Sequence, residues 1–201
     1  QSSTMINCTD EGYRIEAFPL LGDCVIATKR YSIGELVLIE KPKIIYRDTL
    51  DVIIKFFDLP QDDQHEILNM FHVKDPSSTR SATDQQDIQC EQLLRQLMKA
   101  ANIIHENYIK KKSSIITSVQ TIFSVLSIVN FNCHAWKYSE NGTQEESQQA
   151  LFPLLSKVQH SCRPNVQYSS LNVSYKGYGA YIACRDIDIG EAITYAYIDV
   201  G

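Results

Sequence analysis

The pattern of hydrophobic and polar residues divides the 201-residue chain into three stretches. Residues 13–46 contain short β-branched and aromatic runs that end at glycine or proline, which predicts short strands. From about residue 51 to residue 130 the apolar positions recur every three or four residues, which predicts helices. After residue 131 the pattern is strand-like again, with a final strand expected from Ala192 to Ile198. The predicted order of strands, a helical segment and further strands indicates an α+β fold.

Three helices are predicted within the helical stretch. A short helix follows Pro60, a long one begins near Asp84, which resembles an N-cap, and a third opens at Ser113-Ser114. One face of the long helix is expected to comprise Ile88, Leu94, Leu97, Met98, Ala101, Ile104 and Tyr108. Further along, Asn172–Tyr175 and Ala180–Cys184 are expected to pair as a hairpin.

Composition and charge narrow the class of protein. With 44% hydrophobic and 21% charged residues, the chain reads as soluble and globular. No apolar run approaches the roughly 20 residues that span a bilayer, and no segment resembles a signal peptide. The net charge of −5 argues against direct binding of nucleic acid. We therefore expect a cytoplasmic or nuclear protein with no membrane partner.

The six cysteines are irregularly spaced and form no Cys-x-x-Cys pair. Without an export signal, reduced thiols are expected rather than a disulfide framework. Cys133, His134, His160 and Cys162 leave a zinc-binding scaffold open as an alternative, although their spacing matches no usual zinc finger. The main interpretation includes no metal site.

Two motifs near the end of the chain carry the strongest functional signal. Gln159–Asn165 reads Gln-His-Ser-Cys-Arg-Pro-Asn, and Gly190–Tyr197 reads Gly-Glu-Ala-Ile-Thr-Tyr-Ala-Tyr. In this order they resemble the signature of SET-domain protein-lysine methyltransferases, whose first motif begins with Asn where this chain has Gln159. The resemblance implies a single SET domain over residues 1–201, with small curved sheets, a pseudoknot near the final tyrosine and a helical insertion at about 50–130. No post-SET segment is recognisable.

Further stretches extend the resemblance. Gly22–Thr28 is similar to the family's opening Gly-x-Gly-x-x-Ala-Thr, with Cys24 in place of the second glycine. Val129–His134 and Tyr195–Asp199 resemble the SET-and-MYND branch, although the MYND zinc finger, which needs paired cysteines, is missing.

The resemblance implies S-adenosylmethionine as the cofactor. Its implied binding residues are Gly22, Asp23, Cys24, Asn132, Ser156, Val158, Gln159 and His160, with the backbone around Gly22–Cys24 meeting the methionine end. Tyr197 is implied as the catalytic residue that orients the amine and the methyl group. Tyr195 is implied to line the substrate channel, with a packing role as the alternative.

The leading hypothesis is therefore methyl transfer from S-adenosylmethionine to the ε-amine of a protein or peptide lysine, in a histone or another protein. The alternative is a catalytically degenerate SET-fold module for protein interaction, which the substitutions at Gln159 and Cys24 and the absent post-SET segment favour.

Overall fold

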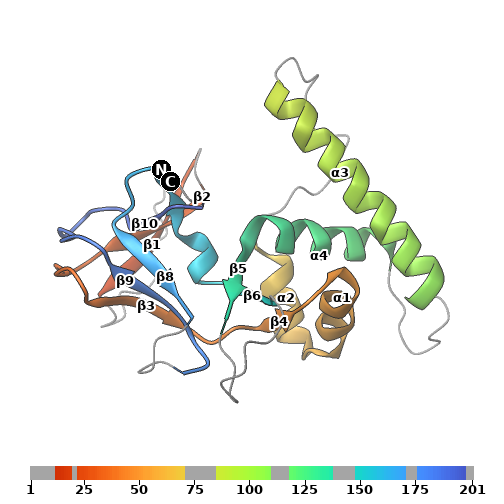
Figure 1. Cartoon of the computed structure of the whole chain (residues 1–201), viewed down its shortest axis with the longest axis horizontal. Coiled ribbons are helices and arrows are strands. Elements are labelled where there is room, and N and C mark those ends of the chain that lie inside the picture. Colours follow the sequence, from red (N-terminus) through yellow and green to blue (C-terminus); the bar gives the residue numbers. More distant parts are fainter. Residues whose placement is uncertain are drawn as a thin grey trace. The chain divides into compact units, whose positions relative to one another are not determined.

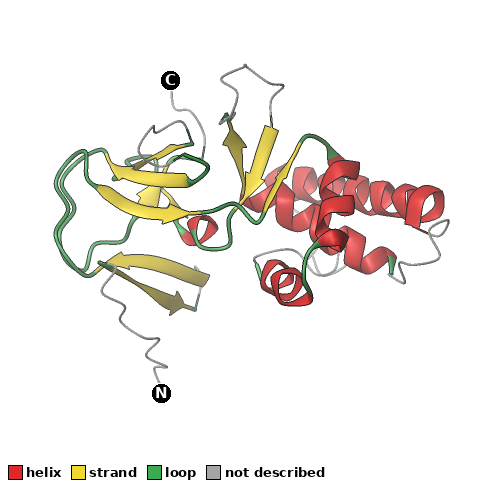
Figure 2. Ribbon diagram, turned by 90° about the horizontal axis from the view of Figure 1, so that it is seen from below, coloured by secondary structure: helices red, strands yellow, loops and turns green. Residues whose placement is uncertain are grey.

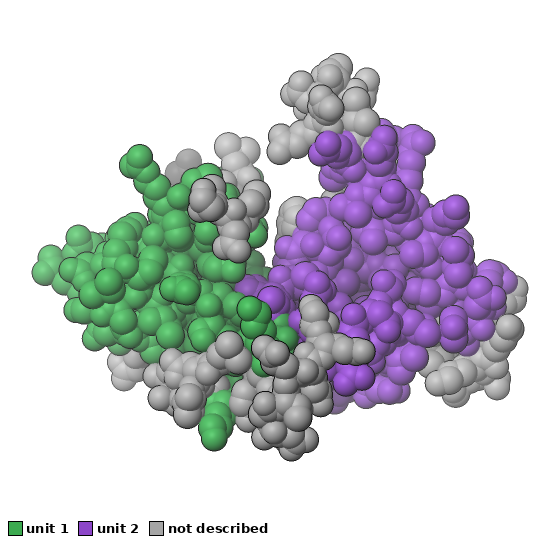
Figure 3. All heavy atoms as spheres, viewed as in Figure 1, with its two compact units in different colours: residues 1–42, 136–145, 152–201 green, residues 43–135, 146–151 purple. Residues whose placement is uncertain are grey.

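The computed structural model describes residues 12–19, 22–70, 85–109, 118–137, 148–170 and 176–197. Short strands lie before and after a run of helices, so the predicted α+β arrangement is confirmed (Figures 1 and 2). The chain divides into two compact units (Figure 3). Unit 1 comprises Gln1–Pro42, Trp136–Glu145 and Phe152–Gly201, and unit 2 comprises Lys43–Ala135 and Glu146–Leu151.

Unit 1 consists of small sheets, some of which pair strands far apart in sequence. Strand β1 (Tyr13–Phe18) pairs antiparallel with β2 (Gly22–Ala27). A second sheet has the antiparallel order β3-β9-β8 and comprises β3 (Leu36–Glu40), β9 (Gly179–Ala183) and β8 (Val166–Ser169). A 3₁₀ helix, η3 (Leu155–Lys157), leads into β7 (Gln159–His160), which pairs in parallel with β10 (Thr194–Tyr195).

Two similar turns precede β3 and β10. Gly34 and Gly190 have φ angles of +87° and +84°, a conformation that side-chain-bearing residues rarely adopt. In each turn the glutamate that follows the glycine accepts a hydrogen bond from the main-chain N–H three residues earlier. The distances are 2.7 Å from Ser32 to Glu35 and 3.2 Å from Asp188 to Glu191. Gly34-Glu35 and Gly190-Glu191 are therefore turn-forming pairs.

Unit 2 holds the helices and most of a third sheet. The sheet has the order β4-β6-β5, with β4 (Ile44–Tyr46), β6 (Gln148–Leu151) and β5 (Cys133–Trp136), whose last residue belongs to unit 1. The helices are α1 (Thr49–Asp58), α2 (Gln61–Leu68), α3 (Gln85–Ile104) and α4 (Val119–Asn132). Their shared core includes Val52, Ile53, Phe56, Ile67, Leu94, Ala101, Ile122, Phe123 and Leu126. The main-chain N–H of Lys43 donates to the carbonyl of Leu151 at 3.0 Å, so the two ends of unit 2 lie side by side.

The helix after Pro60 and the long helix are confirmed. Leu94, Ala101 and Ile104 are buried and Leu97 and Met98 pack against the core, as the predicted face requires. The prediction that Tyr108 lies on that face is wrong, because 51% of its surface is exposed. The reason is a π-helical turn, η2 (His105–Ile109), which changes the angle between successive residues and rotates Tyr108 away. Asp84 and the side chain of Ile88 lie outside the described residues.

Some predicted boundaries are wrong. The third helix begins at Val119 rather than at Ser113-Ser114, because the Ser118 side chain accepts a hydrogen bond from the N–H of Thr121 at 3.1 Å and caps the helix there. No helix among the described residues is long and apolar enough to cross a membrane.

In the hairpin region the strand that pairs with β9 is β8, while the predicted strand Asn172–Tyr175 lies outside the described residues. In the described part of the predicted final strand the chain changes partners. Ala192 bridges Ile26 of β2, whereas the residues described as pairing with β7 are Thr194 and Tyr195. Ile198 lies outside the described residues.

Candidate functional site

The parallel pair β7–β10 brings the two sequence motifs of the C-terminal part together. Thr194 lies opposite Gln159, and Tyr195 opposite His160. Two residues further, the hydroxyl of Tyr197 donates to the main-chain carbonyl of Val158 at 2.6 Å. The main-chain N–H of Tyr197 donates to Nδ1 of His160 at 3.0 Å, and the two rings lie 5.3 Å apart. The last tyrosine is thus held at the motif at both its backbone and its hydroxyl.

The contacts of His160 indicate which of its ring nitrogens accepts a hydrogen bond. Because Nδ1 accepts the main-chain N–H of Tyr197, a neutral imidazole carries its proton on Nε2. The sulfur of Cys162 lies 3.5 Å from that Nε2. His160 therefore acts as a hydrogen-bond acceptor that orients the backbone at Tyr197.

A cluster of tyrosines surrounds Tyr195. Its ring centroid lies 5.2 Å from Tyr181, 6.0 Å from Tyr197 and 6.4 Å from Tyr168. Burial raises the pKa of Tyr168, Tyr181 and Tyr197 above the ordinary value for tyrosine, so these hydroxyls stay protonated at neutral pH. Tyr181 is fully buried, whereas Tyr195 is half-buried and Tyr197 is exposed, so the accessible surface of the cluster lies at the last two tyrosines.

Sequence reasoning missed Tyr168 and Tyr181. They come from β8 and β9, where they stand opposite each other in the antiparallel register. No local motif marks either residue, and only the cross-strand register places them beside Tyr195. A signal could have come from the pairing of the two strands, but the predicted hairpin used a different partner strand.

The opening stretch of β2 lies against the segment before the motif. The side-chain amide of Gln159 donates to the main-chain carbonyl of Asp23 at 2.9 Å. Lys157 forms an ion pair with the carboxylate of Asp23. Gly22 has a φ angle of +74°, and a Cβ built on it would meet nothing within 4 Å. The backbone at Gly22 is therefore open to close approach.

Cys24 lies within β2, opposite Glu16, and its side chain is buried. Burial raises the pKa of the Cys24 thiol, and the carboxylates of Asp23 and Glu16 raise it further. The substitution of the family's second glycine therefore places a neutral thiol in the packed strand. The Cys24 Sγ donates a weak hydrogen bond to the main-chain carbonyl of Gly22 at 3.8 Å.

Ser156 and Asn132, two further predicted cofactor-binding residues, each donate a hydrogen bond to a nearby main-chain carbonyl. Ser156 donates through Oγ to the carbonyl of Pro153 at 3.1 Å. Asn132 belongs to unit 2, where it ends α4 and donates from its amide to the carbonyl of Ile128 at 2.7 Å. The other predicted residues, from Gly22 to Tyr197, belong to unit 1. The cofactor and catalytic roles of all of them stay predictions.

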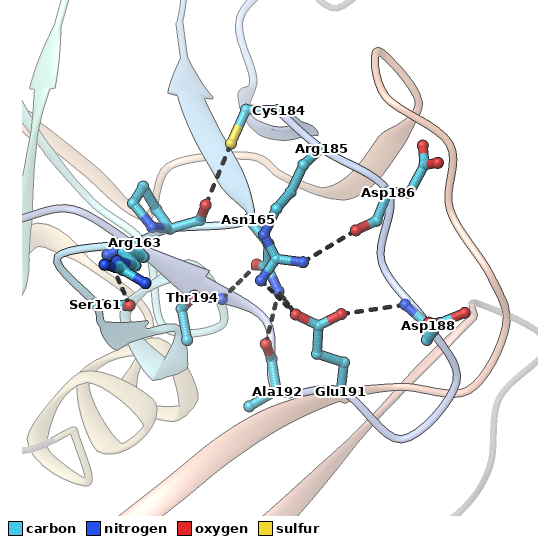
Figure 4. Close-up of polar contacts among 11 residues, drawn as sticks. Ser161, Arg163, Asn165, Cys184, Arg185, Asp186, Asp188, Glu191, Ala192 and Thr194 are labelled. Carbon is cyan, nitrogen blue, oxygen red and sulfur yellow. Dashed lines mark hydrogen bonds and ion pairs between the residues drawn. The ribbon is translucent and has the colours of Figure 1, made fainter.

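Asn165, the last residue of the first motif, is fully buried and ties it to the second (Figure 4). Its amide nitrogen donates to the carbonyl of Ala192 at 2.8 Å and to Glu191 at 3.2 Å. Glu191 also forms an ion pair with Arg185, and the Arg185 guanidinium holds the pKa of the Glu191 carboxyl below its usual range. These contacts place the strand that leads to Tyr195 and Tyr197.

The zinc-scaffold alternative finds no support in the described part of the chain. Within it, no group of three or more His, Cys, Asp or Glu side chains is arranged to hold a metal ion.

Comparisons with known proteins identify the family and the fold. A family model described as SET domain matches residues 22–198. Among solved structures, the SET domain of LSMT bound to lysine and AdoHcy has a TM-score of 0.63 at 9% identity, over 97% of this chain and 51% of that chain. The same SET domain bound to methyllysine and AdoHcy has a TM-score of 0.65 at 11% identity, over 96% of this chain and 50% of that one.

Rubisco LSMT bound to AdoMet has a TM-score of 0.59 at 9% identity, over 97% of this chain and 50% of that one. The chain thus spans about half the length of these structures, with which it shares a fold. A search among curated proteins finds no match to this chain.

Proposed function

Because the chain belongs to the SET domain family, we propose that it transfers a methyl group from S-adenosylmethionine to the ε-amine of a protein lysine. The observation that carries this proposal is the placement of Tyr197. Its hydroxyl contacts the carbonyl of Val158, and its main chain contacts His160. The residue proposed to orient the reacting groups is thereby anchored to the motif proposed to bind the cofactor.

The similar solved structures support the cofactor and substrate class. LSMT has been captured with AdoMet, with AdoHcy, and with lysine or methyllysine. By analogy we assign this chain the same cofactor and a lysine side chain of a protein or peptide as substrate. At identities of 9–11% the analogy is one of fold, so the contacts in unit 1 must supply the chemical argument.

The residues present suit S-adenosylmethionine. The open backbone at Gly22 leaves room for a ligand beside β2. Asp23 and Lys157 offer both signs of charge, and the segment from Val158 to His160 offers main-chain polar groups. We assign Gly22, Asp23, Cys24, Ser156, Val158, Gln159 and His160, all of unit 1, to this site. The cofactor role of Asn132 stays a prediction from the sequence. When bound, the cofactor supplies a methyl group on a positively charged sulfur.

The tyrosines would favour the neutral form of the substrate lysine amine and align it. A free lysine amine is protonated in water, with a pKa near 10.4. The ring of Tyr195, supported from behind by the fully buried Tyr181, would help exclude water from the amine and favour its neutral, nucleophilic form. The Tyr197 hydroxyl, with its proton committed to Val158, keeps its lone pairs for an N–H of the amine. Correct alignment of the amine is a large part of the rate acceleration.

We place the chain nearest the SET-and-MYND branch of the family, on the residues Val129–His134 and Tyr195–Asp199. We further propose histone or other protein lysines as substrates and the cytoplasm or nucleus as the site of action. The mildly acidic net charge of −5 suits a basic peptide partner.

A second candidate function is that of a catalytically degenerate interaction module. One observation favours it, because the Gln159 amide is already engaged with the carbonyl of Asp23, and a side chain that satisfies a main-chain group is less free to meet a ligand.

Calorimetric titration of S-adenosylmethionine and S-adenosylhomocysteine into the protein separates the two candidates. Micromolar binding of both, followed by transfer of labelled methyl groups to a lysine-rich protein mixture, is the expected result. Binding without transfer to any lysine substrate would favour the interaction module. Absence of any binding would overturn the proposed enzyme.

A further inference from the structure

We propose that a face of unit 1 formed by two Ile-Gly-Glu turns binds a second copy of this chain. The turns are residues 32–35, before β3, and residues 188–191, before β10. Ile33 and Ile189 occupy equivalent positions in them and are 67% and 63% exposed. These are the two highest values among the large hydrophobic side chains that the structure describes. The two turns therefore present apolar surface that the described fold leaves uncovered.

The two turns belong to one short antiparallel ribbon. At its centre Tyr31 and Ile187 exchange two main-chain hydrogen bonds, of 3.0 and 2.9 Å. On either side of this pair, the glycine N–H of one turn donates at 2.8 Å to an alanine carbonyl of the opposite segment. An antiparallel pair has a local two-fold axis perpendicular to its plane, so equivalent residues lie on the same side. Ile33 and Ile189, each two residues beyond the central pair, therefore share one face.

This face is open to an approaching molecule. A Cβ built on Gly34 or on Gly190 would meet no atom within 4 Å, so both turns project into open space. An ion pair between Arg30 and Asp188, 3.1 Å long, joins the two segments, and its side chains are 80% and 78% exposed. A pair this exposed contributes little to stability, so its members can exchange partners at little cost.

The charges of the face are self-complementary. The first segment, residues 29–35, has a net charge of +1 from two basic side chains and one acidic one, which are Lys29, Arg30 and Glu35. The second segment, residues 185–191, has a net charge of −2 from one basic and three acidic side chains, which are Arg185, Asp186, Asp188 and Glu191. A second copy offers each segment a partner of opposite sign. A uniformly acidic or basic partner would be attracted by one segment and repelled by the other.

The charge pattern also selects the arrangement of the two copies. A two-fold symmetric dimer uses the same surface on both copies, so each contact occurs twice. In the proposed dimer the first turn of one copy packs against the second turn of the other. Ile33 then meets Ile189 of the second copy, and Arg30 meets Asp188 of the second copy. Burial of the isoleucines stabilises the dimer, while the charges determine which turns meet.

Sedimentation equilibrium measures the dissociation constant of the dimer for the wild-type protein and for variants of the two isoleucines. In Ile33→Ser and Ile189→Ser we expect the constant to rise at least about tenfold, because each change removes an apolar side chain from two places in the dimer. Ile103→Ser is the matched control, since Ile103 is 51% exposed on α3 of unit 2, and it should leave the constant unchanged. Circular dichroism of each variant checks that it is folded.

Two results of this experiment would overturn the inference. One is a wild-type protein that stays monomeric at about 1 mM, which would leave the face to a different protein. The other is a dimer with the same dissociation constant in the wild type and in both isoleucine variants, because the contact between copies would then lie elsewhere.

Charge reversal tests the arrangement of the copies. Arg30→Asp and Asp188→Arg each place like charges at both Arg30–Asp188 contacts of the dimer, so each variant alone should dimerise at least about tenfold more weakly. In a mixture of the two variants, both contacts of the mixed dimer join opposite charges. Association should then return to within about threefold of the wild type. Mixing cannot repair an ion pair lost within one chain, so two variants that stay monomeric together would overturn the proposed contact.

Discussion

Asn165 and Thr194 hold each other by two hydrogen bonds. The main-chain N–H of Asn165 donates to the carbonyl of Thr194 at 3.1 Å, and the N–H of Thr194 donates to the side-chain oxygen of Asn165 at 2.8 Å. The second bond uses a side chain, so it depends on the identity of residue 165. Part of the connection between the first motif and the second therefore depends on the side-chain amide of Asn165.

Replacement of Asn165 by alanine should lower the free energy of unfolding by about 2–4 kcal/mol. The change removes the partners of the buried groups at Ala192 and Thr194, and buried polar groups without partners are costly. Chemical denaturation followed by circular dichroism measures the effect. Asn102→Ala is the control, because Asn102 is exposed on α3 and bonds only locally to Met98 in the contacts described for it. A similar loss in both variants would contradict the proposed link between the motifs.

Replacement of Tyr197 by phenylalanine should reduce turnover about a hundredfold, because the variant loses the hydroxyl that aligns the amine. Binding of S-adenosylhomocysteine should change little, since the ring and the main-chain bond to His160 remain. Methyl transfer assays and calorimetry on the same preparations separate the two effects. Tyr178→Phe, at an exposed tyrosine of the β9 turn, should behave as the wild type. Unchanged turnover in Tyr197→Phe would remove Tyr197 from the catalytic role.

His134 should make unit 2 less stable in acid. Burial lowers its pKa to about 4 from an ordinary value of 6.5. The unfolded chain therefore takes up the proton first as the pH falls, and stability is lost between about pH 6.5 and pH 4. The full effect is about 3 kcal/mol, from 1.36 kcal/mol for each pKa unit.

Unfolding free energies measured from pH 7 to pH 4 test this expectation. The variant His134→Gln should lose this part of the pH dependence, whereas His65→Gln, at an exposed position of α2, should keep it. The same pH slope in the His134 variant and in the wild type would show that other groups cause it.

Gly179 of β9 should tolerate no side chain. A Cβ there would lie 2.6 Å from Cζ of Phe152 and 3.0 Å from Cδ1 of Leu155. Gly179→Ala should therefore destabilise the protein by about 1–3 kcal/mol through overcrowding. Adding Phe152→Leu makes room, so the double variant should lose less than the sum of the two single losses. Strict additivity in the double-mutant cycle would exclude the clash as the cause.

Much of the fold could be predicted from local pattern. The runs that became β2 and β3 are rich in β-branched residues, and the spacing of Leu94, Ala101 and Ile104 defined the buried face of α3. The pattern failed at Tyr108, because a π-helical turn changes the periodicity from which such a face is read.

Pairing between distant segments was beyond the local pattern. The partner of β9 is β8, and the last strand changes its partner from β2 to β7 within a few residues. Such choices depend on the register of strands far apart in sequence, which periodicity does not contain.

For the candidate site, the resemblance to the family's motifs indicated His160 and Tyr197, which do lie in contact. It could not indicate Tyr168 and Tyr181, because their place beside Tyr195 arises from cross-strand register alone. Lys157 was passed over for another reason. Its ion pair is with Asp23, a residue from the opposite end of the chain, and no local pattern indicates that contact.

The hydrogen bond between Lys43 and Leu151 has a consequence for the order of folding. Strand β3 must find β9, and closing a loop that contains all of the helices costs more entropy the longer the loop remains flexible. The helices of unit 2 form from contacts between near neighbours, which assemble quickly. Once they have joined Lys43 to Leu151, the flanking segments emerge from adjacent points, and the effective loop becomes short. We therefore expect the helical segment to shorten the loop that must close before β3 can pair with β9.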